Sequence, residues 1–218
     1  METKIPSSVV YMEDCVEAMK RYPDKYFDLA VVDPPYGIGE DGAKNHSRGK
    51  IATARAYTPK KWDRKIPDQI YFLELYRVSK NQIIWGGNYY GMPASSCWLV
   101  WDKENGKADF ADCELAWTSF KTAVRKFRYR WSGMLQENMK DKEIRFHPTQ
   151  KPVALYDWCL KRYAKDGDKI LDTHLGSGSS RIAAYKAGLD FVGFEIDEEY
   201  YQKQEERFNL FISQSRLF

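Results

Sequence analysis

The sequence lacks the features of a membrane-bound, secreted or zinc-binding protein. No apolar run approaches the ~18 residues that a membrane span needs, and residues 1–6 contain no apolar core of a signal peptide. The four cysteines stand far apart and form no C-x-x-C pair, which argues against a zinc ribbon and predicts buried, reduced thiols. The three histidines are too scattered to indicate a metal site. We therefore expect a cytoplasmic protein without a bound metal.

The composition is that of an ordinary globular protein. Hydrophobic residues make up 43% of the 218 residues, which is near the usual fraction for a folded domain. A chain of this length buries enough surface to form a core by itself. We expect a single domain over residues 1–218.

The net charge of +3 conceals two basic segments, residues 38–66 and 120–146. Each contains eight Lys or Arg against three Asp or Glu, so the rest of the chain is acidic. Such segments suit a polyanion, because each phosphate contact releases counterions, although solvated loops carry similar charge. The first segment shows no periodicity and is expected to be a long loop. The candidates for phosphate contact are Arg48, Lys50, Arg55, Lys60, Lys61, Arg125, Lys126, Arg128 and Arg130.

Residues 126–131 alternate between basic and aromatic side chains. In an extended strand the basic residues Lys126, Arg128 and Arg130 point to one side and the aromatic residues to the other. Two interpretations stay open. The strand is either a half-buried edge strand that its charges protect from aggregation, or a surface that follows a phosphate backbone.

Apolar periodicity predicts alternating strands and helices along most of the chain. Expected strands cover residues 8–12, 27–32, 82–85, 98–101, 114–117, 169–171 and 190–194. Expected helices cover residues 14–23, 67–79, 152–163 and 198–211, with another after residue 178. This order predicts an α/β fold with a doubly wound, mostly parallel sheet.

A glycine turn follows the expected strand that ends at Asp172. Gly176 and Gly178 let the backbone approach a ligand, and the helix that follows offers free N–H groups. Glu195 ends the next strand, where an acid suits ribose hydroxyls. The turn is neither G-x-G-x-x-G nor a Walker loop, which disfavours a nicotinamide-linked oxidoreductase. We expect a pocket for a nucleoside cofactor.

The run Asp33-Pro34-Pro35-Tyr36 follows the buried strand 27–32. The two prolines fix φ and lack N–H groups, so they are expected to leave carbonyls free as acceptors and to hold Asp33 and Tyr36 apart. This geometry suits an amino group on a flat heteroaromatic ring, with N–H groups bound by Asp33 and the Pro34 carbonyl and with Tyr36 stacked on the ring. A rigid turn with a capping Asp is the plainer interpretation.

Three motifs together resemble the S-adenosylmethionine-dependent DNA amino-methyltransferases. They are Asp33 to Tyr36, Asp172 with the glycine turn to Ser180, and His147-Pro148-Thr149-Gln150-Lys151-Pro152. Their order is that of the family's beta group. The resemblance implies a Rossmann-like methyltransferase fold with a small target-recognition insertion, S-adenosylmethionine as cofactor, double-stranded DNA as partner, and methylation of an adenine amino nitrogen after base flipping.

The resemblance also assigns residues. Asp33, Pro34, Pro35 and Tyr36 would hold the flipped base, and Thr149 and Lys151 would cover the methionine carboxylate. The implied cofactor residues are Asp14, Asp33, Thr149, Lys151, Asp172, His174, Gly176, Ser177, Gly178, Glu195 and Ile196. Asp14 has an equal alternative as a helix cap. Thr173-His174 departs from the usual Pro-Phe, which predicts weaker or pH-dependent cofactor binding, and His147 is expected to be a structural hydrogen-bonding residue.

Several alternatives stay open at the level of function. Aspartate at position 33 favours adenine in the family, but methylation of cytosine N4, of RNA or of a protein amide uses the same chemistry. A catalytically weak nucleic-acid-binding protein on the same fold is a further alternative. A homodimer and a cognate restriction endonuclease, as in restriction–modification systems, are the partners that the resemblance raises.

Overall fold

One eight-stranded sheet organises the part of the chain that the computed structural model describes, residues 5–39, 60, 62–105, 111–132 and 135–215. In spatial order the strands are β1 (Ser8–Met12), β10 (Asp190–Glu195), β9 (Lys169–Asp172), β2 (Phe27–Val32), β3 (Ser79–Trp85), β5 (Cys113–Thr118), β4 (Trp98–Asp102) and β6 (Arg125–Arg128). The strands from β1 to β3 are parallel, β5 is antiparallel to both of its neighbours, and β6 is parallel to β4. A separate two-stranded sheet pairs β7 (Trp131–Ser132) with β8 (Leu135–Gln136).

The central strands are buried on both faces, as their unbroken apolar sequences predict. Along β2, Leu29 and Val31 belong to one hydrophobic cluster, whereas Ala30 and Val32 belong to a second cluster on the other face. All four side chains are at most 1% exposed. The sheet therefore needs helices on both sides.

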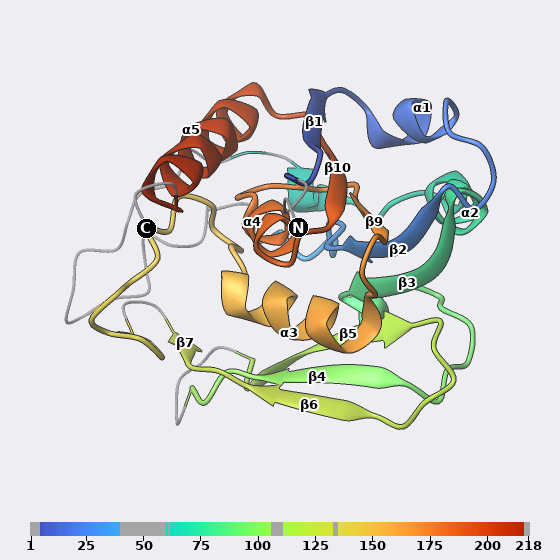
Figure 1. Cartoon of the computed structure of the whole chain (residues 1–218). Helices are drawn as coiled ribbons and strands as arrows, with labels where there is room; N and C mark the ends of the chain where they lie inside the picture. The colour runs from blue at the N-terminus through green and yellow to red at the C-terminus, as the bar shows by residue number, and fades with distance from the viewer. Residues whose placement is uncertain (1–4, 40–59, 61, 106–110, 133–134, 216–218) are drawn as a thin grey trace.

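Helices cover both faces of the sheet (Figure 1). The core residues of α1 (Cys15–Met19) and α2 (Gln69–Val78) pack on one face, and those of α3 (Val153–Tyr163) and α4 (Ser179–Lys186) pack on the other. Helix α5 (Glu198–Ser215) lies against α4 and β10. Two short 3₁₀ turns, η2 (Trp62–Arg64) and η3 (Gly87–Tyr89), complete the described elements. This arrangement confirms the predicted doubly wound α/β fold.

The direction of the crossovers reverses between β2 and β9. The chain leaves β2 toward β3 on one side, and it leaves β9 toward β10 on the other side. In open α/β sheets ligands bind in the crevice outside the carboxyl ends of the strands at such a switch point. The fold therefore points to this edge of the sheet as the functional site.

Some sequence-based expectations differ from the structure. The alternating run 126–131 does not form one strand, because β6 ends at Arg128 and Trp131 starts the separate sheet. All four cysteines are free, but only Cys97 and Cys159 are buried, and Cys113 is exposed at the start of β5. Residues 40–59 and 61 of the predicted basic loop lie outside the described residues. Within the described part of the chain, no helix has the length and apolar character that crossing a bilayer requires.

Candidate functional site

The predicted site residues meet at the carboxyl edge of the parallel strands. Asp33 follows β2, Asp172 ends β9, and Glu195 ends β10. Asp14 follows β1, whose last residue Met12 is paired with Glu195. Because parallel strands end at the same edge, the fold brings together side chains that are up to 181 positions apart in sequence.

The diproline corner is more tightly closed than its sequence suggested. The Tyr36 hydroxyl donates a hydrogen bond to Asp33 Oδ1 at 2.7 Å, so the two residues are joined and not held apart. The Tyr90 hydroxyl donates to the carbonyl oxygens of Pro34 at 2.7 Å and Pro35 at 3.2 Å. The expectation of free carbonyls is therefore wrong. A carbonyl oxygen has two lone pairs, so the Pro34 oxygen keeps capacity for one more donor.

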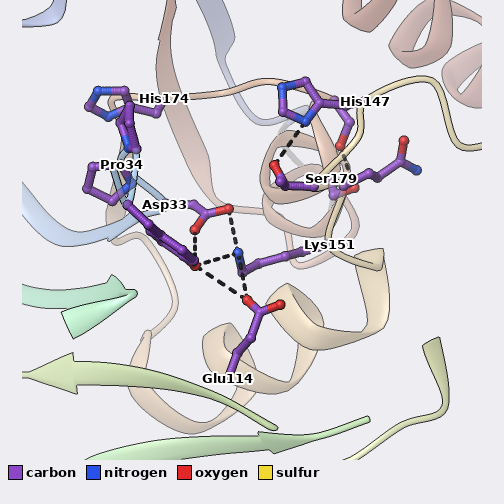
Figure 2. A network of polar contacts seen from close by, with 12 residues as sticks. Asp33, Pro34, Glu114, His147, Lys151, His174 and Ser179 are labelled. Atoms are coloured by element: carbon purple, nitrogen blue, oxygen red, sulfur yellow. Dashed lines mark hydrogen bonds and ion pairs between the residues drawn. The ribbon is translucent and has the colours of Figure 1, made fainter. Parts of the chain in front are cut away.

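Two charged residues complete this corner (Figure 2). The ammonium group of Lys151, which is 3% exposed, lies 2.5 Å from Asp33 Oδ2, 3.0 Å from Glu114 Oε2 and 2.9 Å from the Tyr36 hydroxyl. The other carboxylate oxygen of Glu114 forms an ion pair with Lys103. Asp33, Tyr36, Glu114 and Lys151 form one polar cluster, which is the candidate for catalysis and is therefore called the catalytic cluster.

Burial and neighbouring charges act against each other in this cluster. Burial raises the pKa of Asp33, and Lys151 offsets this only in part. For Glu114, burial opposes ionisation, but Lys151 and Lys103 together lower its pKa to about 2. Burial likewise opposes the charge on Lys151, but the two carboxylates outweigh it and raise the pKa of the amine. Lys151 and Glu114 are therefore ionised at neutral pH.

The ring of Tyr36 is held by aromatic and backbone contacts. It stacks on Tyr89 with 4.9 Å between ring centroids and an interplanar angle of 18°. Gly86, with a φ of +71°, approaches the ring so closely that a Cβ atom there would lie 2.2 Å from a ring carbon. Tyr89 is 42% exposed, so the stacked pair has an open side toward solvent.

The glycine turn follows β9 and lies at the same edge of the sheet as the catalytic cluster. Gly176 and Gly178 both have positive φ, and Gly178 precedes α4. Glu195 accepts hydrogen bonds from the Gly176 N–H at 2.7 Å and the Asp197 N–H at 2.9 Å. Asp172 is fully buried and accepts from the Ser180 hydroxyl and the His174 N–H, and burial raises its pKa to about 7. Ser177 is also buried in the turn.

Residues 147–151 connect the glycine turn with the catalytic cluster. The His147 ring packs against the Tyr200 ring with 4.3 Å between centroids and a tilt of 57°, and two of its ring atoms lie 3.5 Å from the position of a Cβ atom on Gly176. Thr149 Oγ1 lies 3.2 Å from His147 Nδ1. Lys151 reaches the cluster from the same segment. Burial lowers the pKa of His147 to about 3, so this imidazole is neutral and structural at physiological pH.

The His174 side chain is an uncharged, packed ring at neutral pH. It contacts Tyr71 edge-on at 5.2 Å, and its Nδ1 lies 3.0 Å from Thr173 Oγ1. Burial lowers the pKa of His174 to about 4. An imidazole that stays neutral packs as an aromatic ring would, so its protonation should affect the pocket only well below neutral pH.

Two other predicted cofactor residues differ in character. Asp14 caps α1, since its carboxylate accepts from the Val16 and Glu17 N–H groups at 2.9 and 3.0 Å. The structure thus shows the capping alternative. Ile196 follows Glu195 and leaves its side chain 69% exposed, which offers an apolar surface next to that carboxylate.

The predicted phosphate-binding residues divide into three groups. Arg48, Lys50, Arg55 and Lys61 lie outside the described residues. Lys60 does not present a free charge as predicted, because it pairs with Asp197 and Glu199 and lies over the Tyr200 ring. Arg125, Lys126 and Arg128 of β6 are exposed, and so is Arg130, which follows the strand. Of these, Lys126 lies 3.6 Å from Asp102 and Arg128 pairs with Glu104.

The roles of Glu114, Lys103 and the neighbouring Tyr89 and Tyr90 at this site were not predicted from the sequence. One signal was available for Glu114, because it is an isolated acid at the start of an otherwise apolar strand. Such a residue needs a buried partner. In the ranges given above, no group of three or more His, Cys, Asp or Glu could hold a metal ion.

Comparisons with known proteins identify the family of the chain. A family model described as DNA methylase, for N6 and N4 methyltransferases, matches residues 98–206, which is half of the chain. The Type II methyltransferase M.HinfI of Haemophilus influenzae is 25% identical over 242 residues, which cover 89% of this chain and 66% of that protein.

Solved structures share the fold at low sequence identity. The complex of M1.HpyAVI with SAM has a TM-score of 0.54 and 18% identity, and the match covers 92% of this chain and 98% of that one. The PvuII DNA methyltransferase, described as cytosine-N4-specific, has a TM-score of 0.59 and 14% identity, with 93% and 87% covered.

Proposed function

The chain belongs to the N6/N4 DNA methylase family, and from this premise we propose that it transfers a methyl group from S-adenosylmethionine to the exocyclic amino nitrogen of adenine in DNA. The observation that carries the proposal is the link made by residues 147–151. This short segment holds His147 beside the glycine turn and Lys151 in the catalytic cluster, so the turn and the cluster are neighbours at one edge of the sheet.

The residues around the glycine turn fit the cofactor. Positive φ at Gly176 and Gly178 removes side chains from a wall that a ligand has to approach closely. Glu195 places a carboxylate where ribose hydroxyls can donate to it, and Ile196 exposes an apolar side chain next to it. When bound, S-adenosylmethionine supplies a methyl group on a positively charged sulfur.

The catalytic cluster would orient the target amine. Such an amine is a poor nucleophile, because its lone pair is conjugated with the ring. Asp33 and the remaining lone pair of the Pro34 carbonyl can accept its two N–H bonds and favour a tetrahedral nitrogen. Tyr36 offers a stacking surface to a base that has left the helix, which requires Tyr89 to move from the ring. Positioning and electrostatics are thus the protein's contribution.

DNA would be held by the exposed basic side chains of β6 and the residues that follow it. Phosphate contacts position a duplex without reading its sequence, and the basic loop 38–66 adds charge to the same chain. Adenine as target rests on the aspartate at position 33, since the family's cytosine enzymes more often begin this motif with serine. A homodimer and a restriction endonuclease partner stay predictions.

The test is transfer of a labelled methyl group to duplex DNA, followed by analysis of the nucleosides. We expect N6-methyladenine from the wild type and none from Asp33→Ala. N4-methylcytosine would move the assignment to cytosine. A protein that binds DNA but neither binds S-adenosylmethionine nor transfers methyl groups would be the non-catalytic alternative.

A further inference from the structure

Glu114 enters the catalytic cluster from the part of the sheet where β5 joins the parallel strands. It stands on β5, which is antiparallel to β3 and β4. Its Oε2 lies 3.0 Å from Lys151 Nζ and 3.3 Å from the Tyr36 hydroxyl, and its side chain is 21% exposed. A carboxylate in this position is stable only because cations flank it.

The charges alternate along a row of ion pairs that ends at Asp33. Lys103 pairs with Glu114, Glu114 with Lys151, and Lys151 with Asp33. The three N–H bonds of the Lys151 ammonium are matched by three acceptors, on Asp33, Glu114 and Tyr36. In such a row of alternating charges, weakening one ion pair strengthens the neighbouring ion pair. The hold of Lys151 on Asp33 therefore depends on the charge of Glu114.

We propose that Glu114 is a positioning residue for methyl transfer. It shares the ammonium group of Lys151 with Asp33 and so weakens the Lys151–Asp33 pair, which leaves the Asp33 carboxylate able to accept the N–H bonds of the target amine. Lys103 limits this effect, because it neutralises part of the charge of Glu114. The inference rests on the proposed function for its catalytic meaning. The electrostatic coupling among Lys103, Glu114, Lys151 and Asp33 does not depend on the proposed function.

Other titratable groups also face Asp33. They are Tyr36 in the same corner, Lys151 from the 147–151 segment, Glu114 from β5, Tyr90 after η3, Tyr156 of α3 and Asp172 at the end of β9. Changes at Glu114 and Lys103 leave the others in place. The two substitutions therefore alter the charge near Asp33 in opposite directions with the same surroundings.

The experiment compares Glu114→Gln and Lys103→Met with the wild type by the pH dependence of kcat/KM for methyl transfer to duplex DNA. The fall of kcat/KM at low pH, the acid limb of the profile, reports the ionisation of Asp33 in the free enzyme. Glu114→Gln should move this limb to lower pH and reduce the plateau about tenfold, since small misplacements of reacting groups act on this scale or more. Lys103→Met should move the limb to higher pH.

The control is Lys80→Met, which breaks the ion pair with Asp28 at the opposite end of the sheet and should leave the limb unchanged. Thermal unfolding of each variant reports any loss of structure. The proposal would be overturned if the acid limb moved in the same direction in both variants, or if Tm fell and the limb did not move in opposite directions. A merely structural role of Glu114 and Lys103 predicts no opposite movement of the limb.

A second measurement separates this proposal from the proposed function. Carbon-13 NMR titration of the Asp33 carboxyl, assigned by its loss in Asp33→Asn, needs no methyl transfer. Opposite shifts of the Asp33 pKa in the two variants are expected. Absence of methyl transfer with opposite shifts would refute the proposed function alone, and unchanged titration in an active enzyme would refute the role of Glu114 alone.

Discussion

Replacing Gly86 by alanine tests whether the Tyr36 ring has to lie where the structure places it. The added Cβ atom would lie 2.2 Å from a ring carbon, whereas carbon atoms in contact lie about 3.5–4.0 Å apart. The ring therefore has to move by more than about 1 Å. This shift withdraws the hydroxyl from Asp33, which accepts its hydrogen bond at 2.7 Å. A displacement of about 1 Å can reduce catalysis about 100-fold, and we expect such a fall in kcat for Gly86→Ala.

The matched control is Gly188→Ala. Gly188 has a φ of +72°, close to the +71° of Gly86, but an added Cβ atom there has no neighbour within 4 Å. Both variants carry left-handed strain of about 1–2 kcal/mol, which urea unfolding would measure. Only Gly86→Ala should also lose methyl transfer in a single-turnover assay. Equal rates for the two variants would show that the position of the Tyr36 ring does not matter for catalysis.

Three further predictions concern stability and DNA binding. Asp14→Ala should lower the free energy of unfolding by about 1 kcal/mol, the usual effect of a lost helix cap, and unchanged urea unfolding would contradict the capping role. The folded pKa of His174, about 4, lies below its ordinary value of 6.5, so its contribution to stability is lost as pH falls through this interval. His174→Phe should therefore lose less unfolding free energy between pH 7 and pH 5 than the wild type does, and an equal loss would contradict burial of a neutral imidazole. Replacing Arg125 and Arg130 by alanine should lower the slope of DNA affinity against salt concentration by the equivalent of about two phosphate contacts. Lys60→Ala should leave this slope unchanged, because Lys60 is already paired with Asp197 and Glu199. A larger change of slope in Lys60→Ala than in the arginine variant would refute this assignment.

Most of the fold could be predicted from the sequence, because each strand and helix is encoded by the spacing of apolar residues within a short segment. The unbroken apolar run of β2 has to be buried on both faces, which requires a parallel sheet with helices on each side. The glycine turn and the diproline corner each follow such a strand, so their common edge follows from the topology. The family and the fold that these motifs predicted are confirmed.

The details that the sequence did not predict depend on contacts between distant residues. Lys60 was predicted to bind phosphate, but its partner Asp197 lies 137 positions further along the chain. The alternation from residue 126 is real, yet the strand stops at Arg128 and the chain turns to pair Trp131 with Gln136. Glu114 and Lys151 meet only because β5 is placed beside β3. Such pairings require the three-dimensional structure.

The proposed function requires that one cavity bring the target amine into line with the methyl donor. A crystal structure of the protein with S-adenosylhomocysteine and duplex DNA tests it most directly. We expect an extruded base whose amino group contacts Asp33 and the Pro34 carbonyl, with the cofactor sulfur facing the same nitrogen from the glycine turn. Ligands bound in two pockets that open on different sides of the sheet would contradict it.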